Sequence, residues 1–330
     1  MQGARHALLP DGKRLHLQHG PIDIIAGAEG APGEVGAAYA QAAAFFESVL
    51  GDLADELARL RAPVTQECTL AGGVARRMWR AAAPHGAGVT PMIAVAGAVA
   101  DAVLAAMVAG RTLARAHVNN GGDIALHLPE GAAPYRAAVA VDPAAPQLAG
   151  TVEVAPAMPV RGIATSGAPG RSFSLGIADS VTVLARSAAE ADAAATLIAN
   201  AVDLPDHPAI RRARACDLDP DSDLGERPVT VAVGVLAAQQ IDAALAAGAA
   251  RATRLRRSGA IAAAFLALQG RTRIVGAAPP APEQLEPVSR KGLAECHPLS
   301  CASRRSPSRR STMKAASPQP NRCTGSPVSA

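Results

Sequence analysis

Three short segments of the chain hold residue types that can bind a nucleotide or a metal ion. The first is VNNGGDI at 118–124. Glycines let a backbone approach a ligand closely, and Asn119, Asn120 and Asp123 carry hydrogen-bonding groups for a base, a ribose or a phosphate. The alternative is a plain hairpin turn, because Asn-Gly is the strongest short-range hairpin signal.

The second segment is ATSGAPGRSFSLG at 164–176. Thr165, Ser166 and Gly167 form a small polar loop, and Arg171 adds a fixed positive charge. Loops of this kind present backbone N–H groups to phosphates, whose geometry a guanidinium also matches. The alternative is an ordinary loop between two strands. A GxSxG motif is absent, so a hydrolase nucleophile elbow is not supported.

The third segment is EADAAATLIAN at 190–200, which is expected to be helical. Asp192 and Thr196 are four residues apart and therefore share one face of a helix. A carboxylate and a hydroxyl on one face offer the oxygen ligands that Mg²⁺ prefers. The alternative is a solvated aspartate beside a buried threonine.

A fourth candidate, the acidic stretch DLDPDSDLGE at 217–226, fails the test for calcium. Counting from Asp217, an EF-hand loop needs Gly at the sixth position and Glu at the twelfth, and these are Ser222 and Pro228. We interpret this stretch as a solvated acidic loop. The eight histidines form no metal-binding spacing.

The elements that must position these segments alternate irregularly between helix and strand. Apolar residues at steps of three and four predict a long helix over 36–62, and Ser187 with Glu190 forms a capping box that starts a helix over 187–203. Further helices are expected at 68–83, 91–110 and 236–256. A polar loop is expected over 204–228, and strands at 14–20, 21–27, 113–118, 123–128, 135–141, 149–155, 159–164, 171–176, 179–185, 229–235, 259–268 and 271–276. The order predicts an α+β fold.

Composition divides the chain into an expected folded domain over 1–276 and a tail over 277–330. The tail is rich in Pro, Ser and Arg and lacks periodicity, so we predict that it is disordered. Residues 281–330 hold eight basic and three acidic residues, which leaves the rest of the chain nearly neutral. The alternative function for the tail is a basic arm that binds nucleic acid or is phosphorylated.

Several classes of protein are disfavoured by composition. A nearly neutral domain with seven aromatic residues does not fit a nucleic-acid binder. Residues 91–110 have the length of a membrane span, but the central Asp101 favours a buried helix, so no membrane association is expected. Five cysteines without zinc spacing and a start without an apolar region predict a cytoplasmic protein.

Taken in order, these segments resemble the ApbE superfamily, flavin transferases that cleave FAD and attach FMN to a protein threonine. GAVAD at 97–101 resembles the KGYAVD helix segment of that family, VNNGGDI its VNAGGDI turn, ATSG its TSG loop and ADAAAT at 191–196 its ADALAT metal-binding helix. The stretches RLHLQHGPID, TPMIAVAGAVAD and GRSFSLGIADSVTVLA more closely resemble the uncharacterised cytoplasmic UPF subfamily of ApbE-like proteins.

The resemblance implies an ApbE-like architecture of mixed or antiparallel sheets packed with helices. It implies that Asp192, Thr196 and the backbone carbonyl of Val95 bind Mg²⁺. The residues expected to line the site of a flavin nucleotide such as FAD are Asn120, Gly121, Gly122, Asp123, Thr165, Ser166 and Gly167.

One part of the family pattern is absent. Its HxxDPxTG motif corresponds to SLGIADSVTV at 174–183, where Asp179 is the only ionisable residue and hence the candidate catalytic group, and its lysine corresponds to Ala96. Two functions follow: a Mg²⁺-dependent FAD-binding protein related to FMN or nucleotidyl transferases, or a non-catalytic flavin or nucleotide binder. The expected partners are a small-molecule nucleotide, a protein acceptor and a second subunit in a homodimer.

Overall fold

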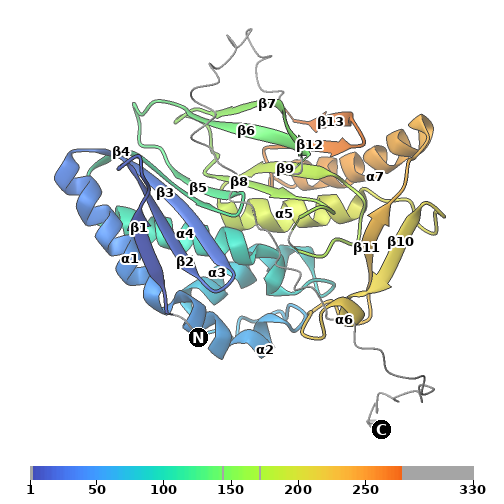
Figure 1. The fold of residues 1–330 in the computed structure, drawn as a ribbon, viewed down its shortest axis with the longest axis horizontal. Helices are drawn as coiled ribbons and strands as arrows, with labels where there is room; N and C mark the ends of the chain where they lie inside the picture. Colours follow the sequence, from blue (N-terminus) through green and yellow to red (C-terminus); the bar gives the residue numbers. More distant parts are fainter. Residues whose placement is uncertain (1–2, 143–144, 171, 277–330) are drawn as a thin grey trace, which may run out of the picture. The chain divides into compact units, whose positions relative to one another are not determined.

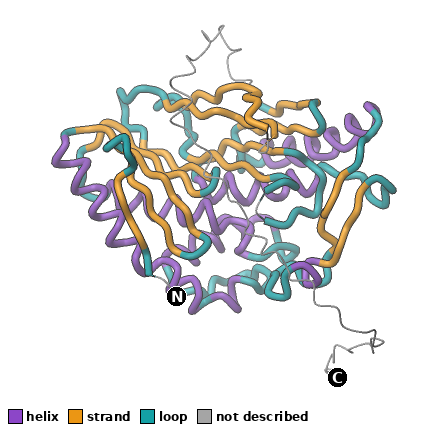
Figure 2. Tube along the Cα trace, in the orientation of Figure 1, coloured by secondary structure: helices purple, strands orange, loops and turns teal. Residues whose placement is uncertain are grey.

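The computed structural model describes residues 3–142, 145–170 and 172–276, which all belong to one compact unit, Met1–Glu283 (Figures 1 and 2). Its main sheet has nine strands in the order β1-β2-β3-β4-β5-β8-β9-β12-β13, with neighbours antiparallel. The strands are β1 (Arg5–Leu8), β2 (Arg14–His19), β3 (Ile22–Gly30), β4 (Leu113–Asn120), β5 (Asp123–His127), β8 (Gly162–Ser166), β9 (Ser180–Ala185), β12 (Ala263–Leu268) and β13 (Arg271–Val275). The expected α+β class is confirmed.

Helices pack on one face of the main sheet, and a β-hairpin packs on the other (Figure 1). The helices are α1 (Pro32–Asp55), α2 (Leu57–Leu60), α3 (Gly73–Ala82), α4 (Val95–Val108), α5 (Ala188–Ala201), α6 (Ala215–Leu218) and α7 (Ala238–Arg257), with short 3₁₀ turns η1 (Ala83–His85) and η2 (Pro91–Ala94). The hairpin joins β6 (Tyr135–Asp142) to β7 (Ala145–Val154), and β10 (Ile210–Arg214) pairs with β11 (Pro228–Val233).

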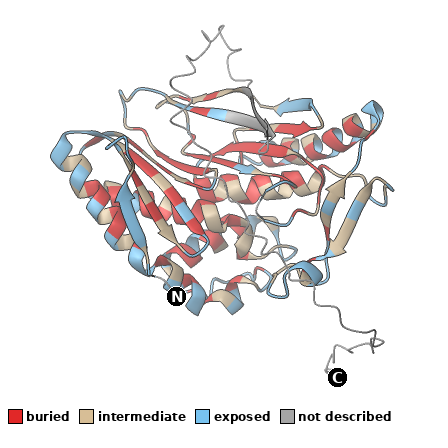
Figure 3. Ribbon diagram, viewed as in Figure 1, coloured by how far each residue is buried: buried red, intermediate tan, exposed pale blue. Residues whose placement is uncertain are grey.

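Alternation along the central strands creates the two faces. In β8, Ala164 packs with α5 and α7, whereas the adjacent Ile163 packs against the opposite face with Val152 and Val154 of β7. The strands β5 and β9 are buried on both faces, as Figure 3 shows. This agrees with the apolar residues that make up most of each strand, which are Ile124, Ala125 and Leu126 in β5 and Val181, Val183, Leu184 and Ala185 in β9.

The helix expected over 91–110 lies inside the fold. Its first turn is the 3₁₀ turn η2, and α4 follows from Val95. The stretch Pro91–Val108 is long and apolar enough to cross a membrane by composition, but 56% of it is buried inside the protein. It packs between the main sheet and its neighbouring helices, which agrees with the interpretation as a core helix.

Several details of the expected secondary structure are wrong, among them a strand expected over 259–268 that begins only at Ala263. Residues 172–176 do not form a strand, because the backbone N–H of Leu175 is bound by Asn200 at the end of α5. The expected loop over 204–228 contains β10 and α6. The long helix ends at Asp55, because the carboxylate of Glu56 leaves the helix to accept N–H bonds from Ala71 and Gly72.

The proposed tail, 277–330, lies outside the described residues, and so does Arg171. The division of the chain at residue 276 stays a prediction.

Candidate functional site

The VNNGGDI segment forms the hairpin turn between β4 and β5. Asn120 pairs with Asp123 across the turn, and Gly121 and Gly122 have φ values of 65° and 115°. A two-residue turn with two positive φ values favours glycine. The hairpin interpretation is therefore confirmed. It places two polar side chains, each less than a tenth exposed, on either side of the turn: Asn120 at the end of β4 and Asp123 at the start of β5.

Both side chains reach out of the hairpin to other elements. The amide of Asn120 donates to the carbonyl of Ala96, 3.0 Å away at the start of α4. One carboxylate oxygen of Asp123 accepts from the backbone N–H of Thr165 at 3.3 Å. Asp123 also shares a side-chain hydrogen bond with Asp192 of α5. The turn, the TSG segment and the helix of Asp192 therefore meet at Asp123.

The TSG segment, Thr165 to Gly167, lies at the end of β8, which is the strand that pairs with β5. The hydroxyl of Thr165 lies 2.9 Å from the hydroxyl of Thr182 in β9. A Cβ on Gly167 would lie 2.3 Å from the carbonyl oxygen of Asp179, so a glycine is needed for the two backbones to approach. Ser166, which lies between Thr165 and Gly167 in the sequence, is half-buried.

Helix α5 begins where the capping pattern predicts. The hydroxyl of Ser187 accepts from the N–H of Glu190 at 3.2 Å. The carboxylate of Glu190 pairs with Arg186 at 3.3 Å, so only one half of the capping box is formed. Asp192 and Thr196, both half-buried, follow one turn apart.

Asp192 is bound to the N-terminus of α4. Its carboxylate accepts from the backbone N–H of Gly97 at 3.0 Å and is also hydrogen-bonded to the N–H of Ala96. Val95, whose carbonyl is the third expected metal ligand, is the first residue of this helix. Asp192 and Val95 are thus held at one place, the N-terminus of α4.

Sequence reasoning missed the counterpart of this contact. Asp101, in the second turn of α4, accepts from the N–H groups of Ala188 and Ala189 at 3.0 Å each, which caps the N-terminus of α5. The only signal in the sequence is a carboxylate within an apolar helix. Gly97 permits the crossing, because a Cβ there would lie 2.3 Å from the carbonyl oxygen of Ala188.

Burial dominates the electrostatics of both aspartates. It raises the pKa of Asp192 well above the usual range of a carboxyl, against the opposing effect of the N–H groups of Gly97 and Ala96. Burial also raises the pKa of Asp101, against its bonds to Ala189 and Ala188. Two carboxyl groups that share a hydrogen bond, as Asp123 and Asp192 do, need a proton or a cation between them.

The candidate catalytic residue, Asp179, is held at a different element. Its carboxylate accepts from the backbone N–H of Gln269 at 2.5 Å, in the turn between β12 and β13. Gln269 has a φ of 44°, so this bond holds a turn in a conformation that few non-glycine residues adopt. The contact gives Asp179 a structural role that is independent of any catalysis.

Magnesium fits the oxygen donors near the Asp123–Asp192 contact. Within residues 3–142, 145–170 and 172–276, no three His, Cys, Asp or Glu side chains form a metal-binding group. Mg²⁺ does not require one, since it is usually held by one or two carboxylates and completed by waters and substrate phosphates. Asp192 and Asp123 would supply the carboxylates, and Thr196 and Val95 neutral oxygens.

The acidic stretch 217–226 begins in the last residues of α6 and continues as a loop. Asp217 pairs with Arg214 at 2.8 Å, and Asp223 accepts from the hydroxyl of Thr90 at 2.6 Å. Their partners are an arginine and a hydroxyl group.

Comparison with known proteins shows similarity over most of the folded part. The family model described as AbpE bacteria matches residues 6–274. A UPF0280 protein of Methanospirillum hungatei is 41% identical over 136 residues, which are 40% of this chain and 53% of the relative. A UPF0280 protein of Methanosphaerula palustris is 42% identical over 132 residues, 39% and 52% of the two chains. The chain spans about half the length of the curated relatives it matches.

Solved structures give more distant likenesses. The apo form of the flavinyl transferase ApbE from Pseudomonas stutzeri is 13% identical, with a TM-score of 0.42, over 82% of this chain and 93% of that one. The flavin transferase ApbE from Vibrio cholerae is 13% identical, with a TM-score of 0.38, over 83% and 97%.

Proposed function

Because the chain belongs to the AbpE bacteria family within the ApbE-like superfamily, we propose that it binds a flavin nucleotide such as FAD together with Mg²⁺. The observation that carries the proposal is the hydrogen bond between Asp123 and Asp192. It joins two segments 69 positions apart in sequence that each have the residue types for such a site.

The residues around this contact have distinct tasks in the proposed complex. The side chains of Asp123, Asp192 and Thr196 and the carbonyl of Val95 hold the cation. The cation, when bound, neutralises the pyrophosphate of the nucleotide and stabilises charge that develops on its oxygens.

The two short turns would contact the nucleotide itself. Gly121 and Gly122 leave one side of the hairpin turn without side chains, and a Cβ on Gly122 would meet no atom within 4 Å. A ligand can therefore approach this backbone closely. Thr165, Ser166 and Gly167 are proposed to line the flavin or phosphate portion from the neighbouring strand.

Two versions of the function differ in whether a bond is broken. In the transferase-like version, the P–O–P bridge of FAD is cleaved, FMN passes to an acceptor hydroxyl on a protein, and AMP leaves. In the alternative version the protein binds the flavin nucleotide without cleaving it. The binder is favoured by Asp179, whose carboxylate is engaged by the backbone of Gln269.

The experiment is a fluorescence titration of FAD into the full chain with Mg²⁺, and then with EDTA, followed by assay of the same samples for AMP. We expect Mg²⁺-dependent binding that weakens at least tenfold in Asp192→Asn, since changes near a metal ligand typically cost 10–100-fold. The matched control is Asp242→Asn on α7, which removes a half-exposed carboxylate that pairs with Arg271 of β13.

AMP release would establish the transferase-like version, and binding without release would establish the binder. Binding that is equal with EDTA, or equal in Asp192→Asn, would contradict the proposed site. A cytoplasmic location is part of the same proposal, supported by the free thiols of Cys68 and Cys216. Cell fractionation tests it.

A further inference from the structure

A groove lies on the helical side of the protein, on the outer surface of α4. Its lining residues come from α4, which we call the floor, and from α1 and the start of α3, which we call the two walls. It encloses about 330 Å³ and is lined mostly by apolar side chains, which are Phe45, Leu53, Val74, Ala75, Ala102, Ala105 and Ala106. We call it the α1/α3 groove. It does not include Asp123 or Asp192.

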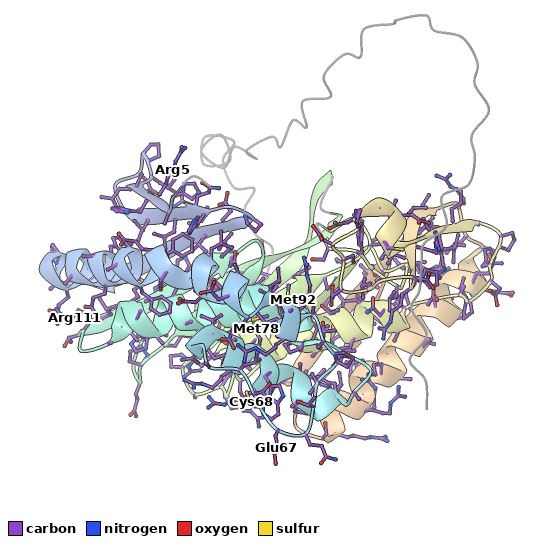
Figure 4. The ribbon with its side chains drawn as sticks, turned by 90° about the horizontal axis from the view of Figure 1, so that it is seen from below. Arg5, Glu67, Cys68, Met78, Met92 and Arg111 are labelled. Atoms are coloured by element: carbon purple, nitrogen blue, oxygen red, sulfur yellow. The ribbon has the colours of Figure 1, made fainter. Side chains whose placement is uncertain are left out.

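The floor of the groove is accessible to a partner. Ala105 is exposed and Ala106 is half-buried, and a side chain of one carbon leaves the helix backbone close to the surface. Leu53 of α1 and Met78 of α3 (labelled in Figure 4) are both buried in the core, so core packing holds the two helices that form the walls. The groove is therefore a preformed apolar surface on rigid helices.

The two walls carry opposite charges. Asp52 lines the groove from α1, and Asp55 follows one turn later; both are exposed. Arg77 lines it from α3, and Arg80 follows one turn later; both are exposed as well. Within the part of the chain that the structure describes, the ion pairs of 4.0 Å or less do not include any of the four.

From this arrangement we propose that the α1/α3 groove is the interface with a second copy of this chain. A two-fold axis that runs along the length of the groove brings each wall against the opposite wall of the partner. The acidic α1 wall then meets the basic α3 wall twice, once on each side of the axis. An apolar floor between complementary charged rims is the usual anatomy of a protein interface.

Charge reversal on each wall tests this proposal. One variant of the full chain carries Asp52→Arg and Asp55→Arg, and the other carries Arg77→Glu and Arg80→Glu. Each alone places like charges on facing walls, so its dimer dissociation constant should rise at least tenfold relative to wild type, as measured by sedimentation equilibrium. When the two variants are mixed, the walls that face each other carry opposite charges again, so the variants should form a heterodimer.

The mixing experiment distinguishes a lost interface from a damaged fold, because a misfolded variant cannot be rescued by its partner. A third variant, Ala105→Glu, places a charge on the exposed floor and should give a monomer that neither partner rescues. Circular dichroism of each variant verifies that it is folded.

Three results would overturn the proposal. The first is a wild-type chain that stays monomeric up to about 100 μM. The second is a dimer that the charge reversals leave unchanged. The third is a pair of folded monomeric variants that form no heterodimer when mixed.

Discussion

Asp101 and Asp192 each cap the N-terminus of the helix that carries the other. Asp101 of α4 binds the first N–H groups of α5, and Asp192 of α5 binds N–H groups at the start of α4. Helix N-termini have unpaired N–H groups and favour negative charge. The reciprocal contact therefore fixes the relative position of the two helices, and with it the position of Asp192 near Asp123.

Removing the side chain of Asp101 should destabilise the protein. Ala188 and Ala189 are buried, so their N–H groups would lose an acceptor that water does not easily replace. We expect Asp101→Ala to lower the free energy of unfolding by about 1–3 kcal/mol, and Asp101→Asn to lower it less. Urea unfolding measures both. The control Glu47→Gln, exposed on α1, should have no effect, and equal stability of all variants would refute the capping role.

Two glycines in helices should respond oppositely to alanine. At Gly97 a Cβ would lie 2.3 Å from the carbonyl oxygen of Ala188, so α4 and α5 must move apart and Gly97→Ala should cost about 1–3 kcal/mol. At Gly36 of α1 a Cβ meets no atom within 4 Å, so Gly36→Ala should stabilise by up to about 1 kcal/mol. Thermal unfolding of the two variants checks both signs. A Gly97→Ala variant as stable as wild type would be evidence against the tight crossing of α4 and α5.

His117 should make the protein less stable in acid. Burial, and then the charges of Arg115 and Arg14, lower its pKa to about 4, while Glu29 acts in the opposite direction. The ring lies 5.2 Å from that of Tyr135 and is neutral at pH 7. Because the unfolded chain binds a proton near pH 6.5 and the folded one near 4, stability is lost as the pH falls through this window.

The expected loss is on the order of 2 kcal/mol between pH 7 and pH 4.5. His117→Gln should remove this part of the pH dependence, whereas His6→Gln, at an exposed position, should retain it. Urea unfolding at the two pH values provides the comparison. An identical pH dependence in His117→Gln and wild type would show that His117 does not titrate in this way.

Most of the fold was predictable because its elements carry local signals. Ser187 marks the start of α5, and Asn120 to Asp123 mark a hairpin, both through short-range bonds. The strand β1 was missed, since all four of its residues are exposed and show no alternation. The interruption at Glu56 was missed because its cause is a contact with Ala71 and Gly72 of another element.

The candidate site was predictable by residue type but not by contact. Asp123 and Asp192 can each be named from a motif, yet only the fold shows that their carboxyl groups share a hydrogen bond. Asp101 was interpreted only as a charge that disfavours a membrane span. Its bonds to α5 depend on a helix crossing that no local pattern encodes.

The shared cation between Asp123 and Asp192 is the central claim, and a double-mutant cycle tests it most directly. The affinity of the full chain for FAD is measured by calorimetry with and without Mg²⁺ in wild type, Asp123→Asn, Asp192→Asn and the double variant. If both carboxylates hold one cation, each single variant should lose most of the Mg²⁺-dependent affinity and the double variant little more. Additive losses, or a Mg²⁺ effect that survives in all three variants, would contradict the claim.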